Sequence, residues 1–266
     1  MDDLKTPASN ITSDSIPDIL PILPIVDTNL FPKMVLPLVL IQNEAVELID
    51  EAMAGNRMLG LLLSRRSDIN SKHTADDLHR IGTVAIILKM SKMEDDKAQL
   101  LIQGLNRFRV KAFLKDKKYM QARIDVMASK NDERNKENRA LMTNIVEQYE
   151  KIVELSPGLP SEMGHMIKSL QEPNVLADMV ASTINAPVKE KQNVIELLDV
   201  NRRLKKVTRL VNDQLEILEM GSKIQNQVKE DMDKRQREYY LRQQLKAIKD
   251  ELGETDNESV EIKEYR

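Results

Sequence analysis

The chain of 266 residues has no cysteine and no tryptophan, and five tyrosines and three phenylalanines are its only aromatic residues. Without cysteine there can be no disulfide scaffold, no thiolate zinc site and no cysteine nucleophile. The same absence fits a reducing compartment, so we expect a cytoplasmic protein.

Excess charge of one sign is also missing, since 40 Lys and Arg stand against 43 Asp and Glu. A net charge of −3 argues against a strongly electrostatic nucleic-acid binder. Hydrophobic residues make up 41% of the chain, which is enough to bury a core. At roughly 100–200 residues per domain, we expect one large domain or two modest ones.

No secretory or membrane-spanning segment is expected. Residues 1–18 carry four aspartates against one lysine, the wrong sign for a signal peptide, and predict a disordered acidic tail. The most apolar stretch, residues 19–41, holds four prolines that would interrupt a spanning helix. We interpret this stretch as buried strands.

Residues 19–128 are mostly β in pattern. Between Ala98 and Ala112 apolar residues alternate with polar ones, and Gly104 and Asn106 interrupt the apolar side, which predicts a bulge. We expect an antiparallel, strongly coiled sheet or partly open barrel with one short helix. The predicted strands cover residues 22–26, 35–41, 58–64, 81–90, 98–112 and 120–126, and the predicted helix covers residues 44–54.

Apolar spacing changes to the helical period near residue 130. Residues 129–199 predict a helical bundle, and Asp199 is a suitable N-cap for the next helix. Residues 200–253 read as one helix, about 80 Å long, whose distal half is charged and sparsely apolar. Such a helix cannot bury its whole length, so we expect its distal half to reach solvent, another subunit or another domain. The acidic residues 254–266 predict a linker towards a further folded unit.

Motifs of catalysis and cofactor binding are mostly absent. Gly55 and Gly60 have the spacing of a phosphate-binding loop, but Leu61 and Leu62 stand where lysine and a hydroxyl residue are required. The three histidines show no metal-binding spacing, and we expect all of them on the surface. Spacing alone does not exclude a Ser–Lys dyad, but no surrounding motif indicates one. We therefore expect no catalytic, cofactor or metal site in this chain.

Two sets of residues are candidates for contact with a partner. Arg107, Arg109 and Lys111 form a basic row on one side of the long strand, which is either a solvated face or a docking face. Met232 and Tyr239 lie seven residues apart on a charged helix, as in an oligomer or domain contact, although a plain helix surface remains an alternative.

Three segments together resemble the amino-terminal region of bacterial Lon, the ATP-dependent endopeptidase La. They are ILPIVDTNLFPKMVLPL at residues 22–38, QGLNRFRV at residues 103–110 and QREYYLRQQLKAIKDELGE at residues 236–254. The similarity runs from about residue 21 to residue 254. Gln103, where the family often has Glu, is a departure from the family pattern, and the acidic N-terminal extension is another.

The resemblance implies an α+β chain: a PUA-like antiparallel β domain, a helical bundle and a very long C-terminal helix. That helix would lead to an AAA+ module, which binds ATP and magnesium, and to a Ser-Lys protease domain, both outside this chain. The family is a cytosolic homohexamer that degrades misfolded, damaged and short-lived regulatory proteins. This chain would be its non-catalytic part for substrate recognition and tethering, with no cofactor of its own.

By the same resemblance, Met232, Tyr239 and the adjacent Tyr240 are candidates for contact with unfolded polypeptide. An alternative is a stand-alone PUA-like adaptor or nucleic-acid-binding module. The helix of residues 222–252 argues against that alternative, because an adaptor has no use for a connector to a motor.

Overall fold

The structure is a computed structural model that describes residues 15–40, 43–68, 73–92, 98–114, 119–128 and 135–251. The chain divides into two compact units, Met1–Leu215 and Glu216–Arg266. The first unit holds the sheet and a group of helices, and the described part of the second is helical throughout.

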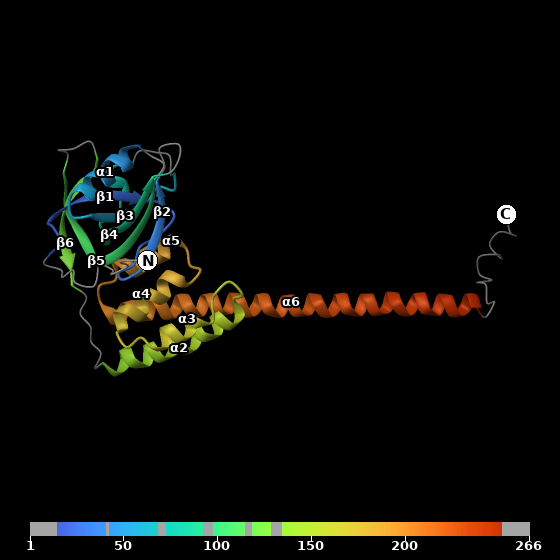
Figure 1. Ribbon diagram of the computed structural model, residues 1–266. Helices are drawn as coiled ribbons and strands as arrows, with labels where there is room; N and C mark the ends of the chain where they lie inside the picture. The colour runs from blue at the N-terminus through green and yellow to red at the C-terminus, as the bar shows by residue number, and fades with distance from the viewer. Residues whose placement is uncertain are drawn as a thin grey trace, which may run out of the picture. The chain divides into compact units, whose positions relative to one another are not determined.

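A six-stranded sheet in the order β2-β5-β4-β3-β1-β6 forms the first part of the chain (Figure 1). An additional pairing of β6 with β5 closes β5, β4, β3, β1 and β6 into a barrel. Strand β2 pairs with the first half of β5, on the edge that β6 occupies further along. The elements are β1 (Ile19–Ile25), β2 (Val35–Leu40), α1 (Asn43–Ala54), β3 (Met58–Leu63), β4 (Ile81–Lys92), β5 (Ala98–Leu114) and β6 (Gln121–Met127).

The predicted fold class is confirmed, with one correction to the strand directions. The sheet is mixed, because β1 and β3 pair in parallel while the other pairs are antiparallel. Strand β2 and helix α1 lie between β1 and β3 in the chain, and this long connection returns the chain to the starting end of β1. Alternation of apolar residues does not report strand direction, so the sequence pattern could not reveal it.

The bulge predicted at Gly104 and Asn106 is present. The β4–β5 pairing shifts between Thr83, opposite Arg107, and Ala85, opposite Gly104, so that β5 carries an extra residue there. Gly104 has no room for a side chain, since a Cβ atom would lie 2.2 Å from the carbonyl oxygen of Phe31.

The apolar core of the barrel extends further towards the N-terminus than predicted. Ile16, which the sequence analysis assigns to the disordered tail, is buried in a cluster with Leu20, Ile22 and Phe108. The Ile124 amide donates to the Asp18 carbonyl oxygen at 2.8 Å, which attaches the segment to β6. The tail boundary at residue 18 is therefore wrong, and residues 1–14 lie outside the described part of the chain.

Between residues 136 and 251, five helices follow one another at the positions where the spacing predicts helical structure. They are α2 (Lys136–Leu155), α3 (Glu162–Lys168), α4 (Pro173–Thr183), α5 (Val188–Glu196) and α6 (Val200–Glu251). Asp199 caps α6 as expected, because its Oδ1 accepts from the Arg202 amide at 2.8 Å. The expected linker, residues 254–266, lies outside the described residues.

A buried ionic cluster joins the sheet to the helices within the first unit. Arg107 on β5 donates from both terminal guanidinium nitrogens to the two carboxylate oxygens of Asp178 on α4, at 2.9 and 2.6 Å. Its Nε donates to the Ile195 carbonyl oxygen at 2.9 Å. Arg203, from the first turn of α6, lies 3.6 Å from Asp178, and burial lowers the pKa of Arg203 to about 10.

Two further hydrogen bonds cross the same junction. Gln192 of α5 donates to the Ile81 carbonyl oxygen at 2.9 Å, and His79 lies 2.7 Å from a carboxylate oxygen of Glu196. His79 is partly buried rather than a surface loop residue as predicted, because α5 packs over it. Polar side chains of the sheet and of helices α4 and α5 thus satisfy one another's hydrogen bonds across this junction.

We predict that Asp178→Asn lowers the free energy of unfolding by about 3 kcal/mol, because two buried guanidinium groups lose their counter-charge. The matched control is Asp125→Asn, which removes the partner of Lys111 in an exposed ion pair. This substitution should change the free energy of unfolding by less than about 1 kcal/mol. Urea unfolding of both variants measures the difference. Equal losses would show that the buried cluster does not hold this junction.

Candidate functional site

A stripe of exposed apolar side chains runs along the second unit. The described part of this unit, residues 216–251 of α6, has exposed side chains at nearly every position. The exposed large apolar residues there are Ile217, Met220, Ile224, Val228, Met232, Tyr239, Tyr240, Leu241, Leu245 and Ile248.

The spacing of these residues places them on two sides of the helix. Ile217, Val228 and Tyr239 recur every eleven residues, which is close to three helical turns, so they form one row together with Ile224 and Met232. Leu241 and Ile248 lie roughly 140–160° around the helix from the centre of this row, and Leu245 lies about 100° from it. We call the first row, with Met220, the α6 stripe.

The predicted substrate-contact residues are accessible on this helix. Met232 and Tyr239 of the α6 stripe are each 65% exposed, and Tyr240 beside them is 66% exposed. Their role in binding stays a prediction. Such an exposure of apolar surface is typical of a contact site rather than of a solvated helix.

The predicted basic row does not form as a single exposed face. Arg107 is only 2% exposed and is turned into the helical part of the first unit by Asp178. Arg109 and Lys111 are exposed, and Lys111 pairs with Asp125 at 3.1 Å. The row is wrong for Arg107, because helices α4 and α5 cover this residue, where Asp178 and the Ile195 carbonyl oxygen bind its guanidinium group.

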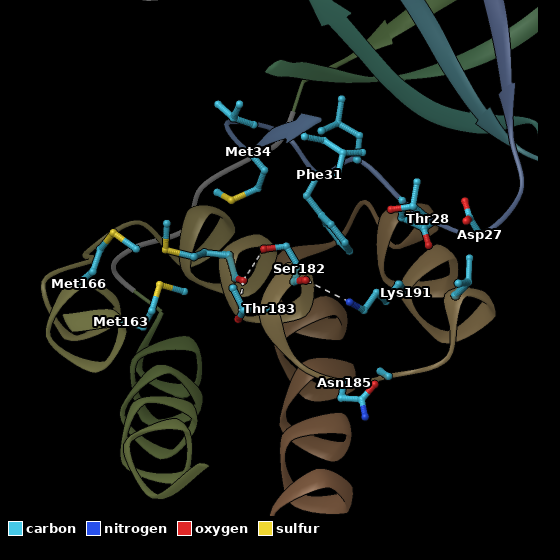
Figure 2. Close-up of a pocket in the computed structure, with 17 residues that line it drawn as sticks. Asp27, Thr28, Phe31, Met34, Met163, Met166, Ser182, Thr183, Asn185 and Lys191 are labelled. Carbon is cyan, nitrogen blue, oxygen red and sulfur yellow. Dashed lines mark hydrogen bonds between the residues drawn. The ribbon is translucent and has the colours of Figure 1, made fainter. Parts of the chain in front are cut away.

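A pocket in the first unit, which the sequence analysis missed, gathers methionines from three separate segments. Met34 precedes β2, Met163 and Met166 belong to α3, and Met179 belongs to α4, and all four line a pocket with a volume of about 590 Å³ (Figure 2). Phe31 also lines it. We call this the methionine pocket. The one signal for it in the sequence is the high number of methionines, 14, but their distance apart in the chain conceals the cluster.

The polar side of the methionine pocket is not an assembled Ser–Lys dyad. Lys191 donates to the carbonyl oxygen of Ser182 at 3.0 Å, and the Ser182 hydroxyl donates to the carbonyl oxygen of Met179 at 2.7 Å (Figure 2). Burial lowers the pKa of Lys191. These contacts satisfy carbonyl groups at the end of α4, which is a structural role.

The structure explains the near-match to a phosphate-binding loop. Gly60 lies inside β3, where a Cβ atom would come within 2.7 Å of Ile22 Cδ1 and 2.8 Å of Phe108 Cζ, so the glycine serves core packing. Within the described ranges, no three His, Asp or Glu residues gather as metal ligands would. No helix among them combines the length and the apolar character needed to cross a membrane.

Comparison with known proteins identifies the family. A family model described as the ATP-dependent protease La (LON) substrate-binding domain matches residues 19–213. The chain belongs to this Lon family. Lon protease from Desulfosudis oleivorans is 49% identical over 97% of the chain, and Lon protease from Syntrophus aciditrophicus is 48% identical over 99%.

Solved Lon structures share the fold. The N-terminal domain of a Mycobacterium avium complex Lon protease superposes with a TM-score of 0.61 at 20% identity, covering 73% of this chain and 98% of that one. A Lon N-terminal domain protein from Xanthomonas campestris gives a TM-score of 0.52 at 17% identity, covering 71% of this chain and 96% of that one. The chain spans about a third of the length of the Lon proteases it matches, 32% and 34% for the two above.

We predict that dilute peroxide oxidises the methionines of this Lon domain in the order of their exposure. Of three methionines that report on different sites, Met232 on the α6 stripe should react fastest, Met166 at the rim of the methionine pocket more slowly, and Met58 in the barrel core, which is 5% exposed, at least about tenfold more slowly than Met232. Peptide mass spectrometry over a time course gives the three rates. A Met58 rate equal to that of Met232 would contradict the described burial.

Proposed function

We propose that this chain is the substrate-recognition and hexamer-tethering region of an ATP-dependent serine protease that degrades misfolded, damaged and short-lived regulatory proteins in the cytoplasm. In this proposal the chain is non-catalytic, and ATP, magnesium and the Ser-Lys dyad belong to modules outside it. The observation that carries the proposal is the match of residues 19–213 to the Lon substrate-binding domain.

The exposed apolar surface of the second unit supports a role in binding unfolded chains. An unfolded protein displays apolar side chains that its folded form buries, so a surface that binds such proteins must itself offer apolar groups to water. Met232 and Tyr239 of the α6 stripe do so, and neither is enclosed by other side chains of the described residues.

The chemistry of these residues suits a binder of many sequences. Methionine is flexible and polarisable, and tyrosine presents a large flat surface, so both accept side chains of different shape. Individually weak contacts gain strength when several copies act together through effective concentration. A homohexamer would supply six copies of the α6 stripe.

The contacts of Arg107 argue against the alternative function, a nucleic-acid-binding module. Its guanidinium group is committed to Asp178 and to a main-chain carbonyl, so it is not available for phosphate. Arg109 and Lys111 are exposed, but two basic residues make only a small surface for binding a phosphate backbone.

We expect the double substitution Met232→Ser and Tyr239→Ser to weaken binding of a reduced, denatured model protein by about tenfold, because two apolar contacts are lost. Fluorescence anisotropy of the labelled denatured protein measures the affinity. The control is Asn226→Ser with Gln244→Ser, two neutral changes on a different side of the same helix.

An affinity that falls equally in both double variants would assign the effect to the helix as a whole. Absence of any binding by the unaltered chain, with the denatured protein in excess, would refute recognition by this region. In the full-length enzyme, the Met232 and Tyr239 variant should slow degradation of unfolded protein while leaving cleavage of small peptides unchanged.

A further inference from the structure

Strand β2 presents an open, apolar edge. Its residues pair with β5 from Val35 opposite Gln103 to Leu40 opposite Ala98, and no strand among the described residues pairs with its other edge. Residues 35–40, VLPLVL, contain no charged side chain. Proteins usually protect such an edge with charged residues, proline, a bulge or a covering element. Residues 35–40 have only Pro37 for this purpose, and it leaves the outward carbonyl oxygens open to a strand that supplies the amides.

The register shows which main-chain groups face outward. Gly104 donates its amide to the Met34 carbonyl oxygen at 2.8 Å, so Met34 is a hydrogen-bonding partner of β5. In an antiparallel pair such residues alternate along the strand, so Leu36, Leu38 and Leu40 also bond to β5. The main-chain groups of Val35, Pro37 and Val39 therefore point to the open edge.

The same three residues form an apolar surface on the outer face of the sheet. Val35 is 50% exposed and Val39 is 55% exposed, and Pro37 between them is exposed as well. Leu101 of β5 lies directly opposite Pro37 and is also exposed. Leu36 and Leu38 point the other way, against the core.

This edge leads into the methionine pocket. Val35 and Leu36, at the start of β2, line the pocket together with Met34. A segment paired with β2 therefore reaches the methionines of α3 and α4 at one end of the strand. The pocket lies within the first unit, as does the whole of β2.

We propose that an extended segment of unfolded substrate adds to the sheet along the open edge of β2 and places an apolar side chain in the methionine pocket. This inference rests on the proposed function and names how a substrate chain is held. Main-chain hydrogen bonding is independent of sequence, and a pocket lined by methionine accepts many apolar side chains, so the mode suits a binder of diverse unfolded proteins.

The position of Pro37 favours a substrate strand over a second copy of β2. Its main-chain nitrogen faces the open edge and has no hydrogen to donate. Two copies of β2 pairing edge to edge would each lack this donor. A substrate strand supplies its own amide groups to the carbonyl oxygens of Val35, Pro37 and Val39.

The test is Val39→Pro in the whole chain, which removes an outward-facing amide and leaves the bonds to β5 in place. The matched control, Val39→Thr, keeps the amide and the β-branched side chain. The probe is a fluorescein-labelled peptide of about ten residues in which leucine alternates with serine. We expect Val39→Pro to weaken its binding about tenfold and Val39→Thr to leave binding nearly unchanged.

A second arm uses the unaltered protein and two further peptides, N-methylated either at every leucine or at every serine amide. One of these two peptides should lose binding and the other should keep it, because only alternate amides of an added strand face β2 and donate to it. This arm answers the question even if Val39→Pro fails to fold.

The outcomes separate the two proposals. Failure of the unmodified peptide and of denatured protein to bind the unaltered chain would refute the proposed function. Binding that neither Val39→Pro nor either N-methylated set weakens would overturn the strand-addition inference and leave the proposed function intact. A dimer in analytical ultracentrifugation that Val39→Pro converts to monomer would also overturn it, since the edge would then serve contact between copies.

Discussion

The ion pair between Arg107 and Asp178 is the interaction on which the arrangement of the first unit depends. Both side chains are buried, and each needs the other because an unpaired charge in this position is strongly unfavourable. The pair joins β5 to α4, and Arg203 and Asn174 extend it to the first turn of α6. The sheet, the short helices and the root of the long helix are thereby fixed around one cluster.

The methionine pocket depends on that junction. The methionine pocket has walls from the segment before β2 and from α3, α4 and α5, so it exists only while the helices stay against the sheet. Gly104, which has no room for a side chain against the Phe31 carbonyl oxygen, lies at the start of the β5 bulge that ends at Arg107.

Most of the fold is predictable because its signals are local. The helix boundaries follow from apolar spacing, Pro173 and the cap at Asp199, and the long helix is visible in its lack of proline. The bulge is visible at Gly104. Parallel pairing of β1 with β3 and the burial of Ile16 are not visible, because both depend on contacts between segments distant in the chain.

Some residues of the candidate sites are likewise predictable from the sequence and others are not. Met232 and Tyr239 share a helix face, so their common exposure can be anticipated from spacing. The basic row fails at Arg107, since alternation along one strand gives no sign that a carboxylate 71 positions away in the chain binds this residue. The methionine pocket combines residues 34, 163, 166 and 179, and no pattern along the sequence connects them.

The central claim is that exposed apolar groups of this domain hold the unfolded client. Hydroxyl-radical footprinting of the chain with and without excess reduced, denatured protein tests this directly. The account predicts protection of Met232 and Tyr239, with the reactivity of Arg109 and Lys111 unchanged. Unchanged reactivity of Met232 and Tyr239, at a concentration where the denatured protein is bound, would contradict it.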